Sequence, residues 1–242
     1  MIRPTRGVVF DTRRPVRGVV FDKDGTLLDF HATWDATFGA LLVDFADGDA
    51  EVLAMLDERL GFDRGVGTIL ENSPFVADSN AQFAAKLAAI IGRAPDDPTL
   101  EREIDEAVHR HAPAMPTAEA GAHELLTELA RRGIPMAIAT NDSENRSRGQ
   151  MVALGWDGDL MGVFGADSGH GEKPDPGMVV AAAAAMGLDP TEVAMVGDSS
   201  TDMGAGNASG AVTVLYGGRV ELRETAAVVI DRLGEIIGLI DA

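Results

Sequence analysis

The sequence predicts an α/β fold, in which a parallel sheet carries helices on both faces and a smaller all-helical domain is inserted after the first strand. Two observations predict this arrangement. Short and almost continuously apolar runs alternate with helical patterns, as they do in sheets that are buried on both faces. By contrast, residues 30–112 contain no convincing strand, and their apolar residues recur every three or four positions.

The length and composition are those of a globular chain. The 242 residues exceed the roughly 100–200 of a typical domain, so one large domain or two unequal ones are expected. Hydrophobic residues make up 45% and charged residues 24%, which excludes disorder of the whole chain. Cysteine is absent, which excludes disulfides, thiolate nucleophiles and cysteine-ligated zinc.

The charge and the apolar pattern limit the classes of partner that this protein is expected to bind. The formal net charge is −19, and a surface this acidic repels phosphate backbones and anionic lipids. We therefore expect no nucleic-acid or membrane partner. No apolar run approaches the roughly 18–20 residues of a membrane span. The arginine-rich N-terminal segment lacks the apolar region of a signal peptide, so we expect a cytoplasmic protein.

The expected strands and helices define the two domains. The core domain is expected at residues 1–29 and 113–242, and the helical domain at residues 30–112. Five apolar runs are predicted to form strands: Gly18–Phe21, Pro135–Ala139, Val193–Val196, Ala211–Leu215 and Ala226–Ile230. The core helices, each followed by glycine as a stop signal, are expected at Ala118–Arg132, Glu144–Leu154 and Gly177–Met186. About four helices are expected in the inserted domain, broken at Gly48, Gly61–Gly67, Ser73-Pro74 and Pro95–Pro98.

A short repeat precedes the first strand. The segment Arg6–Asp11 recurs as Arg17–Asp22, and only the second copy continues into a further carboxylate and a glycine. We therefore expect the first copy to carry no chemistry, although it could add an edge strand. Residues 1–16 are interpreted as an N-terminal extension of the core domain.

The first predicted strand runs directly into two carboxylates, Asp22 and Asp24, and then Gly25. Ligands of an open parallel sheet bind beyond the ends of its strands, and Gly25 allows the sharp turn that leaves the strand. Such a pair can divide the work of nucleophile and proton donor. Taken alone, the pattern fits a solvated acidic turn equally well.

A second acidic strand end favours the chemical interpretation. Asp198 follows the strand at Val193–Val196, and Asp202 lies four residues further on. Hard divalent cations such as Mg²⁺ bind carboxylate oxygens together with water and phosphate. Asp22 and Asp198 at neighbouring strand ends would supply these oxygens, so Mg²⁺ is the expected cofactor. For Asp202 the alternative is a role in capping a helix that starts at Ser199 or Ser200.

Two more segments carry groups that suit an anion. Thr140 and Asn141 close the strand at Pro135–Ala139 with hydroxyl and amide groups at the start of a helix. Lys173, one of only three lysines, lies in a proline-fixed loop before a helix, and a compact cation suits phosphate. Considered singly, Thr140 and Asn141 also fit a plain helix cap, and Lys173 also fits a surface lysine.

Taken together, these segments resemble the haloacid dehalogenase-like superfamily. Its four motifs appear in order as Asp22–Thr26, Thr140, Lys173 and Asp198–Asp202. The resemblance covers about residues 18–27 and 135–215. It implies a Rossmann-like core, a helical cap that closes over the substrate, and Mg²⁺-dependent phosphoryl transfer.

The resemblance also implies a role for each residue. Asp22 would be the nucleophile that forms an aspartyl-phosphate, and Asp24 would protonate the leaving alcohol and then activate water. Lys173 would steady the nucleophile and the phosphate, and Asp202 would support Lys173 or the metal site. The implied metal ligands are Asp22, Asp198 and the backbone carbonyl of Asp24. The implied phosphate contacts are Asp22, Gly25, Thr140, Asn141 and Lys173.

The position of the insert makes the chain similar to the phosphoglycolate phosphatase-like branch, whose helical cap lies between the first two motifs. Asp24 argues against a haloacid dehalogenase proper, which lacks an acid there. Phe30-His31 departs from the small polar residues usual after the first motif, so glycolate is not implied as the leaving group. We therefore expect a phosphatase of small phosphorylated metabolites.

Three other functions stay open at this point. A phosphosugar mutase of the same branch would return the phosphoryl group to a bound sugar. A phosphonate hydrolase would need a cap lysine, such as Lys86, that forms an imine. A non-catalytic phosphometabolite-binding protein would not need the full set of acidic and basic residues. A monomer or a homodimer is expected.

Two residues of the inserted domain are candidates for substrate selection. Arg64, in the glycine-rich loop, could bind a second anionic group of the substrate. His31, near the start of the domain, could reach the site. The alternatives are a solvated arginine, which is the favoured interpretation of Arg64, and a structural histidine.

Overall fold

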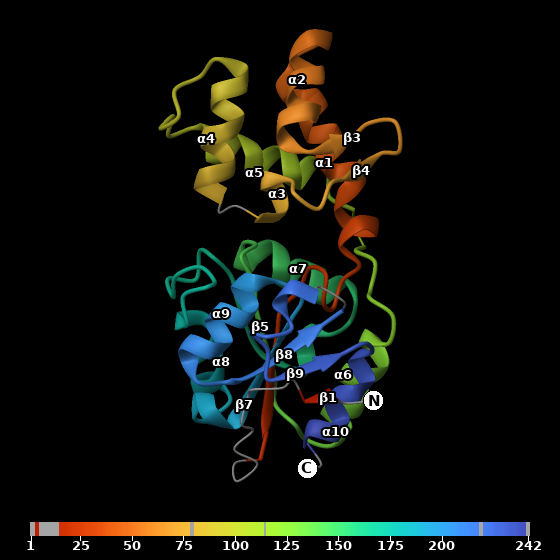
Figure 1. The fold of residues 1–242 in the computed structure, drawn as a ribbon, viewed down its shortest axis with the longest axis vertical. Coiled ribbons are helices and arrows are strands. Elements are labelled where there is room, and N and C mark those ends of the chain that lie inside the picture. Colours follow the sequence, from red (N-terminus) through yellow and green to blue (C-terminus); the bar gives the residue numbers. More distant parts are fainter. Residues whose placement is uncertain (1–2, 5–14, 78–79, 114, 218–219, 241–242) are drawn as a thin grey trace. The chain divides into compact units, whose positions relative to one another are not determined.

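The computed structural model divides the chain into two units (Figure 1). The core unit comprises Met1–Asp29 and Met115–Ala242, and the cap unit comprises Phe30–Ala114. The structure describes residues 3–4, 15–77, 80–113, 115–217 and 220–240. Within these residues, no helix is both long and apolar enough to cross a membrane.

A seven-stranded sheet with the order β1-β9-β8-β7-β2-β5-β6 organises the core unit. Its neighbouring strands are parallel except for β1, which pairs antiparallel with β9. The parallel sheet expected from the apolar runs is therefore confirmed. The strands are β1 (Arg3–Pro4), β2 (Gly18–Phe21), β5 (Met136–Ala139), β6 (Leu160–Phe164), β7 (Val193–Gly197), β8 (Val212–Tyr216) and β9 (Val228–Ile230).

Helices cover both faces of this sheet, because successive residues of a strand point to opposite sides. Val19 and Phe21 of β2 pack in one apolar cluster with residues of α6, whereas Val20 packs in another with residues of α8. Strands β2, β5 and β7 are wholly buried, which explains their continuous apolar sequences. The core helices are α6 (Ala122–Arg131), α7 (Glu144–Ala153), α8 (Gly177–Ala185), α9 (Ser200–Ser209) and α10 (Ile237–Ile240). Short 3₁₀ helices lie at Asp157–Asp159, Pro190–Glu192, Val220–Leu222 and Leu233–Ile236.

The register of the sheet brings three strand ends together. Phe21, the last residue of β2, lies opposite Ile138 of β5 on one side and Val196 of β7 on the other. The residues that follow β2 therefore lie beside those that follow β5 and β7. This edge of the sheet collects polar segments from distant parts of the sequence.

The core unit differs from the sequence expectation in a few places. Strand β6 was not expected, because it is an edge strand interrupted by Gly162 and only partly buried. Helix α6 begins at Ala122 rather than Ala118, because Gly121 adopts a left-handed conformation with φ of 83° immediately before it. The first copy of the repeat, residues 6–11, lies outside the described residues.

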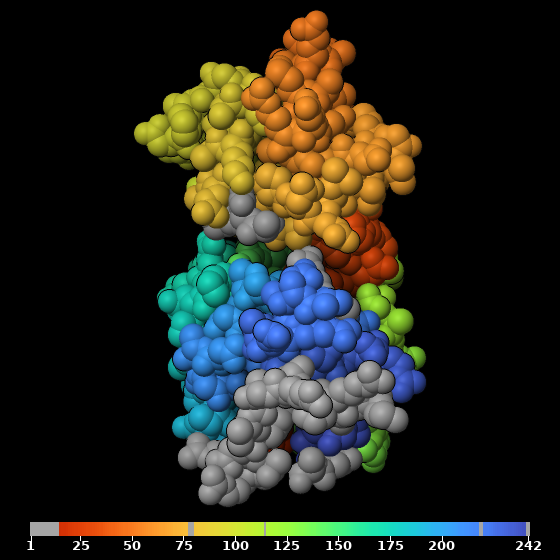
Figure 2. Space-filling model, viewed as in Figure 1, coloured from red at the N-terminus to blue at the C-terminus, as the bar shows by residue number. Residues whose placement is uncertain are grey.

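The cap unit packs its helices around an apolar cluster that includes Phe38, Leu41, Leu56 and Leu87. Figure 2 shows the surface of this unit in orange to yellow. The chain breaks expected at Gly48, Gly61–Gly67 and Pro95–Pro98 fall between helices, whereas Ser73-Pro74 marks the start of α3. The helices are α1 (Phe30–Ala46), α2 (Ala50–Leu60), α3 (Pro74–Ala77), α4 (Asn80–Ile91) and α5 (Leu100–His111).

A short hairpin in the cap unit corrects the expectation that the insert is helical throughout. Strands β3 (Phe62–Asp63) and β4 (Thr68–Ile69) pair antiparallel. The Asp63 carboxylate accepts hydrogen bonds from the backbone N–H groups of Gly65 and Val66, and Gly67 turns the chain with a φ of 78°. Strands of two residues are too short to show an alternating pattern in the sequence, so only the turn residues could be recognised.

Candidate active site

The turn after β2 carries Asp22 out of the sheet while its backbone stays paired. The Asp22 N–H donates to the carbonyl of Val196 at 2.8 Å, and the Asp22 residue is only 7% exposed. Gly25 has a φ of 81°, in the left-handed region that favours glycine, and its N–H donates to the carbonyl of Leu28. The turn therefore has the geometry expected from the Asp22–Thr26 segment.

Lys173 lies at the centre of the site. Its Nζ donates to Asp22 Oδ1 at 2.5 Å and to Asp202 Oδ1 at 2.6 Å, and the residue is 5% exposed. Asn141 holds the backbone of this lysine, because its Nδ2 donates to the Lys173 carbonyl at 3.0 Å and its Oδ1 accepts from the Lys173 N–H at 2.8 Å. Lys173 is thus a buried, doubly paired cation, and the side-chain amide of Asn141 positions its loop.

Asp202 serves two partners with its two oxygens. Its Oδ2 accepts hydrogen bonds from the N–H and the hydroxyl of Ser199, while the Ser199 hydroxyl accepts one from the Asp202 N–H. This reciprocal pair caps the N-terminus of α9. Its Oδ1 accepts the bond from Lys173. Both interpretations of Asp202, helix cap and support for Lys173, therefore fit the same carboxylate.

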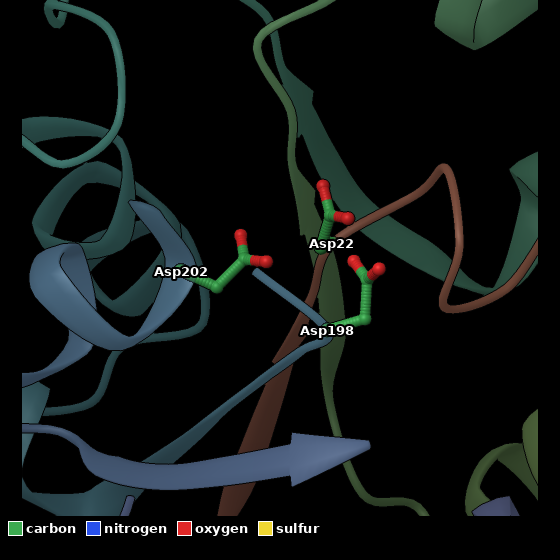
Figure 3. Close-up of side chains that lie close together, drawn as sticks. All are labelled: Asp22, Asp198 and Asp202. Atoms are coloured by element: carbon green, nitrogen blue, oxygen red, sulfur yellow. The ribbon is translucent and has the colours of Figure 1, made fainter. Parts of the chain in front are cut away.

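Three carboxylates lie close together in this site (Figure 3). Asp22 follows β2, Asp198 follows β7 and Asp202 lies on α9, and each offers an oxygen within 4.8 Å of the others. Burial, followed by the charge of Asp202, raises the pKa of Asp22 well above its ordinary value, although Lys173 acts in the opposite direction. Burial alone would lower the pKa of Lys173, but the charges of Asp202 and Asp22 outweigh it and raise that pKa. The cluster therefore favours a further positive charge.

The donors fit a magnesium ion. Carboxylate oxygens are the hard ligands that Mg²⁺ takes from proteins, together with water and substrate phosphate. Because both oxygens of Asp202 are bonded within the protein, Asp22 and Asp198 are the better ligands. A Cβ atom at Gly25 would lie 2.7 Å from Asp198 Oδ2, so only glycine leaves room for this carboxylate. The backbone turn and the acidic cluster are thus shaped to each other.

Thr140 lies at the end of β5 and is 2% exposed. Its N–H donates to the carbonyl of Phe164 at 2.9 Å, and its Oγ1 accepts from the N–H of Asp142 at 3.1 Å. The N-cap of α7 itself is Ser143. Thr140 therefore sits in a turn between β5 and α7, beside the turn that carries Asp22.

The sequence interpretation missed one buried ionic group next to the site. Lys23 is 0% exposed, and its Nζ lies 2.5 Å from Asp24 Oδ2 and 3.1 Å from Asp142 Oδ2. Burial alone would lower the pKa of Lys23, but the charges of Asp24 and Asp142 raise it. The signal available in the sequence was a rare lysine between two acids at the end of a buried strand.

The two cap candidates are held by their own neighbours. His31 Nδ1 lies 3.1 Å from Asp35 Oδ1. The Arg64 guanidinium donates to both carboxylate oxygens of Asp57, at 2.6 and 2.7 Å, and lies 5.1 Å from the centroid of the Phe62 ring. The contacts of His31 fit the alternative of a structural histidine, whereas Arg64 is an exposed arginine that is paired with Asp57. Lys86 is exposed on α4.

Comparison with known proteins adds a family to this geometry. Residues 16–210 match the family model of haloacid dehalogenase-like hydrolases. The chain is 34% identical to a phosphoglycolate phosphatase of Caulobacter vibrioides over 186 residues, which cover 76% of this chain and 73% of that protein. It is 33% identical to a phosphoglycolate phosphatase of Rhodospirillum rubrum over 130 residues, and this match spans only 54% of that protein and 52% of this chain.

The fold also matches solved structures. A haloacid dehalogenase-superfamily hydrolase of subfamily IA from Geobacter sulfurreducens superposes with a TM-score of 0.61. The superposition covers 96% of this chain and 100% of that one, at 20% sequence identity. At this identity the likeness concerns the fold, and it includes both the core unit and the cap unit.

Proposed function

This chain belongs to the haloacid dehalogenase-like hydrolase family, and we propose that it is a Mg²⁺-dependent phosphatase that hydrolyses a small phosphorylated metabolite through an aspartyl-phosphate on Asp22. The observation that carries the proposal is the buried contact of Lys173 with Asp22 and Asp202, beside Asp198. A nucleophile, its counter-charge and a pair of metal ligands are thereby available in one place. Non-catalytic phosphate binding would not need a buried carboxylate beside the anion.

Positive charge is what phosphoryl transfer chiefly requires of a protein. Mg²⁺, when held by the carboxylates of Asp22 and Asp198 and the backbone carbonyl of Asp24, would neutralise charge on the phosphoryl oxygens. Lys173 supplies a second, fixed positive charge against Asp22. The hydroxyl of Thr140 donates to a phosphoryl oxygen in this proposal, and Gly25 leaves space for the anion beside the turn.

The reaction proceeds in two displacements in this proposal. A carboxylate oxygen of Asp22 attacks phosphorus, the bond between phosphorus and the ester oxygen breaks, and Asp24 gives its proton to that leaving oxygen. Water then attacks the aspartyl-phosphate while Asp24 takes up a proton from it. Inorganic phosphate leaves, and Asp22 is restored.

The first substrate class to test follows from the relatives. Two proteins that share a third of their aligned residues with this chain are phosphoglycolate phosphatases. Small phosphorylated carboxylic acids therefore come first, and sugar monophosphates second. The Arg64 guanidinium is already paired with Asp57, so it is a weaker candidate for binding a second anionic group of the substrate.

The test is a panel of phosphorylated metabolites that includes 2-phosphoglycolate and glucose 1-phosphate. We expect release of inorganic phosphate with Mg²⁺, loss of that release with EDTA, and recovery when Mg²⁺ is restored. Asp22→Asn is the matched variant, since it preserves the volume of the side chain and removes the nucleophile. Phosphate release that persists in Asp22→Asn would contradict the mechanism, and isomerised sugar phosphate without free phosphate would indicate a mutase.

A further inference from the structure

We propose that Lys23 is a positioning residue that fixes the carboxylate of Asp24 for its two proton transfers, an inference that rests on the proposed function. The mechanism above assigns no role to Lys23, whose ammonium group lies against Asp24 and Asp142. It is nevertheless a fully buried cation, one residue after the proposed nucleophile and one before the proposed acid/base. Burying a lysine is costly unless it is paired, so its partners indicate its task.

The first partner is Asp24 itself. The Lys23 Nζ lies 2.5 Å from Asp24 Oδ2, and the Asp24 side chain remains 19% exposed while that of Lys23 is 0% exposed. The cation therefore holds the carboxylate from the protein side through one oxygen. The other oxygen, Oδ1, is the one that addresses the leaving group and the water in this proposal.

The second partner anchors the lysine in the fold. Asp142 Oδ2 lies 3.1 Å from Lys23 Nζ, and Asp142 Oδ1 accepts hydrogen bonds from Arg146 Nε and from the Ser143 N–H, both at 2.7 Å. A chain of alternating charges thus runs from Arg146 on α7 through Asp142 and Lys23 to Asp24. It joins the turn after β2 to the turn after β5, which also carries Thr140.

This anchoring would raise the rate of both proton transfers by holding the Asp24 carboxylate in one geometry. Asp24 lies in a turn rather than in a strand, and a carboxylate on a turn has several rotamers available to it. An acid/base that acts on two different oxygens in succession must hold its geometry through both steps. A misplacement of about 1 Å can cost about 100-fold in rate. Lys23 confines Asp24 without occupying the substrate side of its carboxylate.

The test is Lys23→Met, which keeps the length of the side chain and removes its charge. We expect kcat to fall roughly 10- to 100-fold, with KM close to the wild-type value, because the side chain of Asp24 takes no part in ground-state binding of the phosphate in this proposal. The matched control is Lys86→Met, the same change at an exposed lysine of the cap unit, which should leave kcat unchanged.

A double-variant cycle separates positioning from general structural damage. If Lys23 acts through Asp24, then Lys23→Met should cost nothing further in an Asp24→Asn background. A structural role would lower kcat by the same factor in both backgrounds. That result, or a wild-type kcat in Lys23→Met, would overturn the inference.

Asp142→Asn provides a second route, should Lys23→Met fail to fold. It leaves the contact between Lys23 and Asp24 in place and weakens the pairing of residue 142 with Lys23 and Arg146, so we expect a smaller loss of kcat that again vanishes in Asp24→Asn. A loss of equal size in both backgrounds would overturn the proposal. Wild-type activity that Asp22→Asn abolishes keeps the proposed function standing whatever these variants do, whereas an inactive wild-type enzyme would overturn both.

Discussion

The core unit and the cap unit place their charges in opposite environments. In the described part of the core unit, four charged side chains are buried at or beside the strand ends: Asp22, Lys23, Lys173 and Asp202. In the described part of the cap unit, the buried polar side chains are the hydroxyls of Thr33, Thr37 and Ser73. Because buried charge costs stability unless it is paired, the core unit carries a cost that its packing does not explain. The difference supports the core unit as the place of the proposed chemistry.

One carboxylate from each unit shows the same contrast, because the pKa of Asp22 is shifted upward and that of Asp44 is shifted downward. Burial and neighbouring acids raise the pKa of Asp22 well above its ordinary value. Hydrogen bonds from Arg110 and His111 lower the pKa of Asp44, on the surface of the cap unit. The Asp22 carboxylate is thus held where its charge is unfavourable, even beside Lys173, until a further cation joins it. By contrast, the Asp44 carboxylate is already paired and ties α1 to α5.

The largest expected effect concerns Asp22. Asp22→Asn should lower phosphatase turnover roughly 10³-fold or more, because an amide cannot form the acyl-phosphate. The same variant should be at least as stable as the wild type in metal-free buffer at neutral pH, because the raised pKa shows that the charge of Asp22 is unfavourable there. Turnover and thermal unfolding would both be measured. Asp44→Asn in the cap unit is the control and should keep turnover near the wild-type rate.

Lys173 should affect both activity and stability. Lys173→Met removes the cation shared by Asp22 and Asp202, so turnover should be lost and the free energy of unfolding should fall by about 3 kcal/mol at neutral pH. Lys86→Met, on the exposed face of α4, should change neither quantity. Denaturant unfolding without metal would measure the free energy of unfolding of both variants. Equal values would contradict a contribution of Lys173 to the stability of the fold.

Alanine variants of two glycines distinguish the effect of backbone strain from an effect on metal binding. Gly25 and Gly67 have nearly the same φ, 81° and 78°, but a Cβ at Gly25 would lie 2.7 Å from Asp198 Oδ2 and one at Gly67 meets nothing within 4 Å. Both alanine variants should lose about 1–2 kcal/mol of stability through the left-handed conformation. Only Gly25→Ala should also weaken Mg²⁺ affinity, on the order of tenfold, measured as the Mg²⁺ dependence of turnover. Equal Mg²⁺ affinity in both would show that Asp198 is not a metal ligand.

The same contrast explains what the sequence could predict. Strands β2, β5 and β7 are buried on both faces, so their continuous apolar runs could be recognised in the sequence. The edge strand β6 contains Gly162 and has a mixed pattern, so it could not be recognised. The hairpin of the cap unit was legible only as turn residues, because each of its strands has two residues. Local patterns predict buried regular elements well and short or edge elements poorly.

For the candidate site, local sequence patterns indicated residues, whereas the pairing of Lys173 with Asp22 and Asp202 was implied only by the family resemblance. Strand ends indicated Asp22 and Asp198 as candidates, and a proline-fixed loop before a helix indicated Lys173. The contact of Lys173 with Asp202, and that of Lys23 with Asp142, depend on the order of strands in the sheet, which no local pattern encodes. A buried lysine could be suspected from its rarity, but its partner could be identified only from the neighbouring position of β2 and β5.

The smallest expected effect tests the surface of the cap unit. Asp44→Asn should lower the free energy of unfolding at pH 7 by about 0.5 kcal/mol or less, because solvent screens this partly exposed pair. The pKa of Asp44 is lower in the folded state than its ordinary value of 3.8, so between the two values the unfolded chain binds more protons and stability rises with pH. The difference between variant and wild type should therefore be constant above about pH 5 and disappear as the pH falls through the folded pKa, below 3.8. Denaturant unfolding across this range would measure it, and a difference that grew towards low pH would mean that Asp44 stabilises α1 and α5 by something other than its charge.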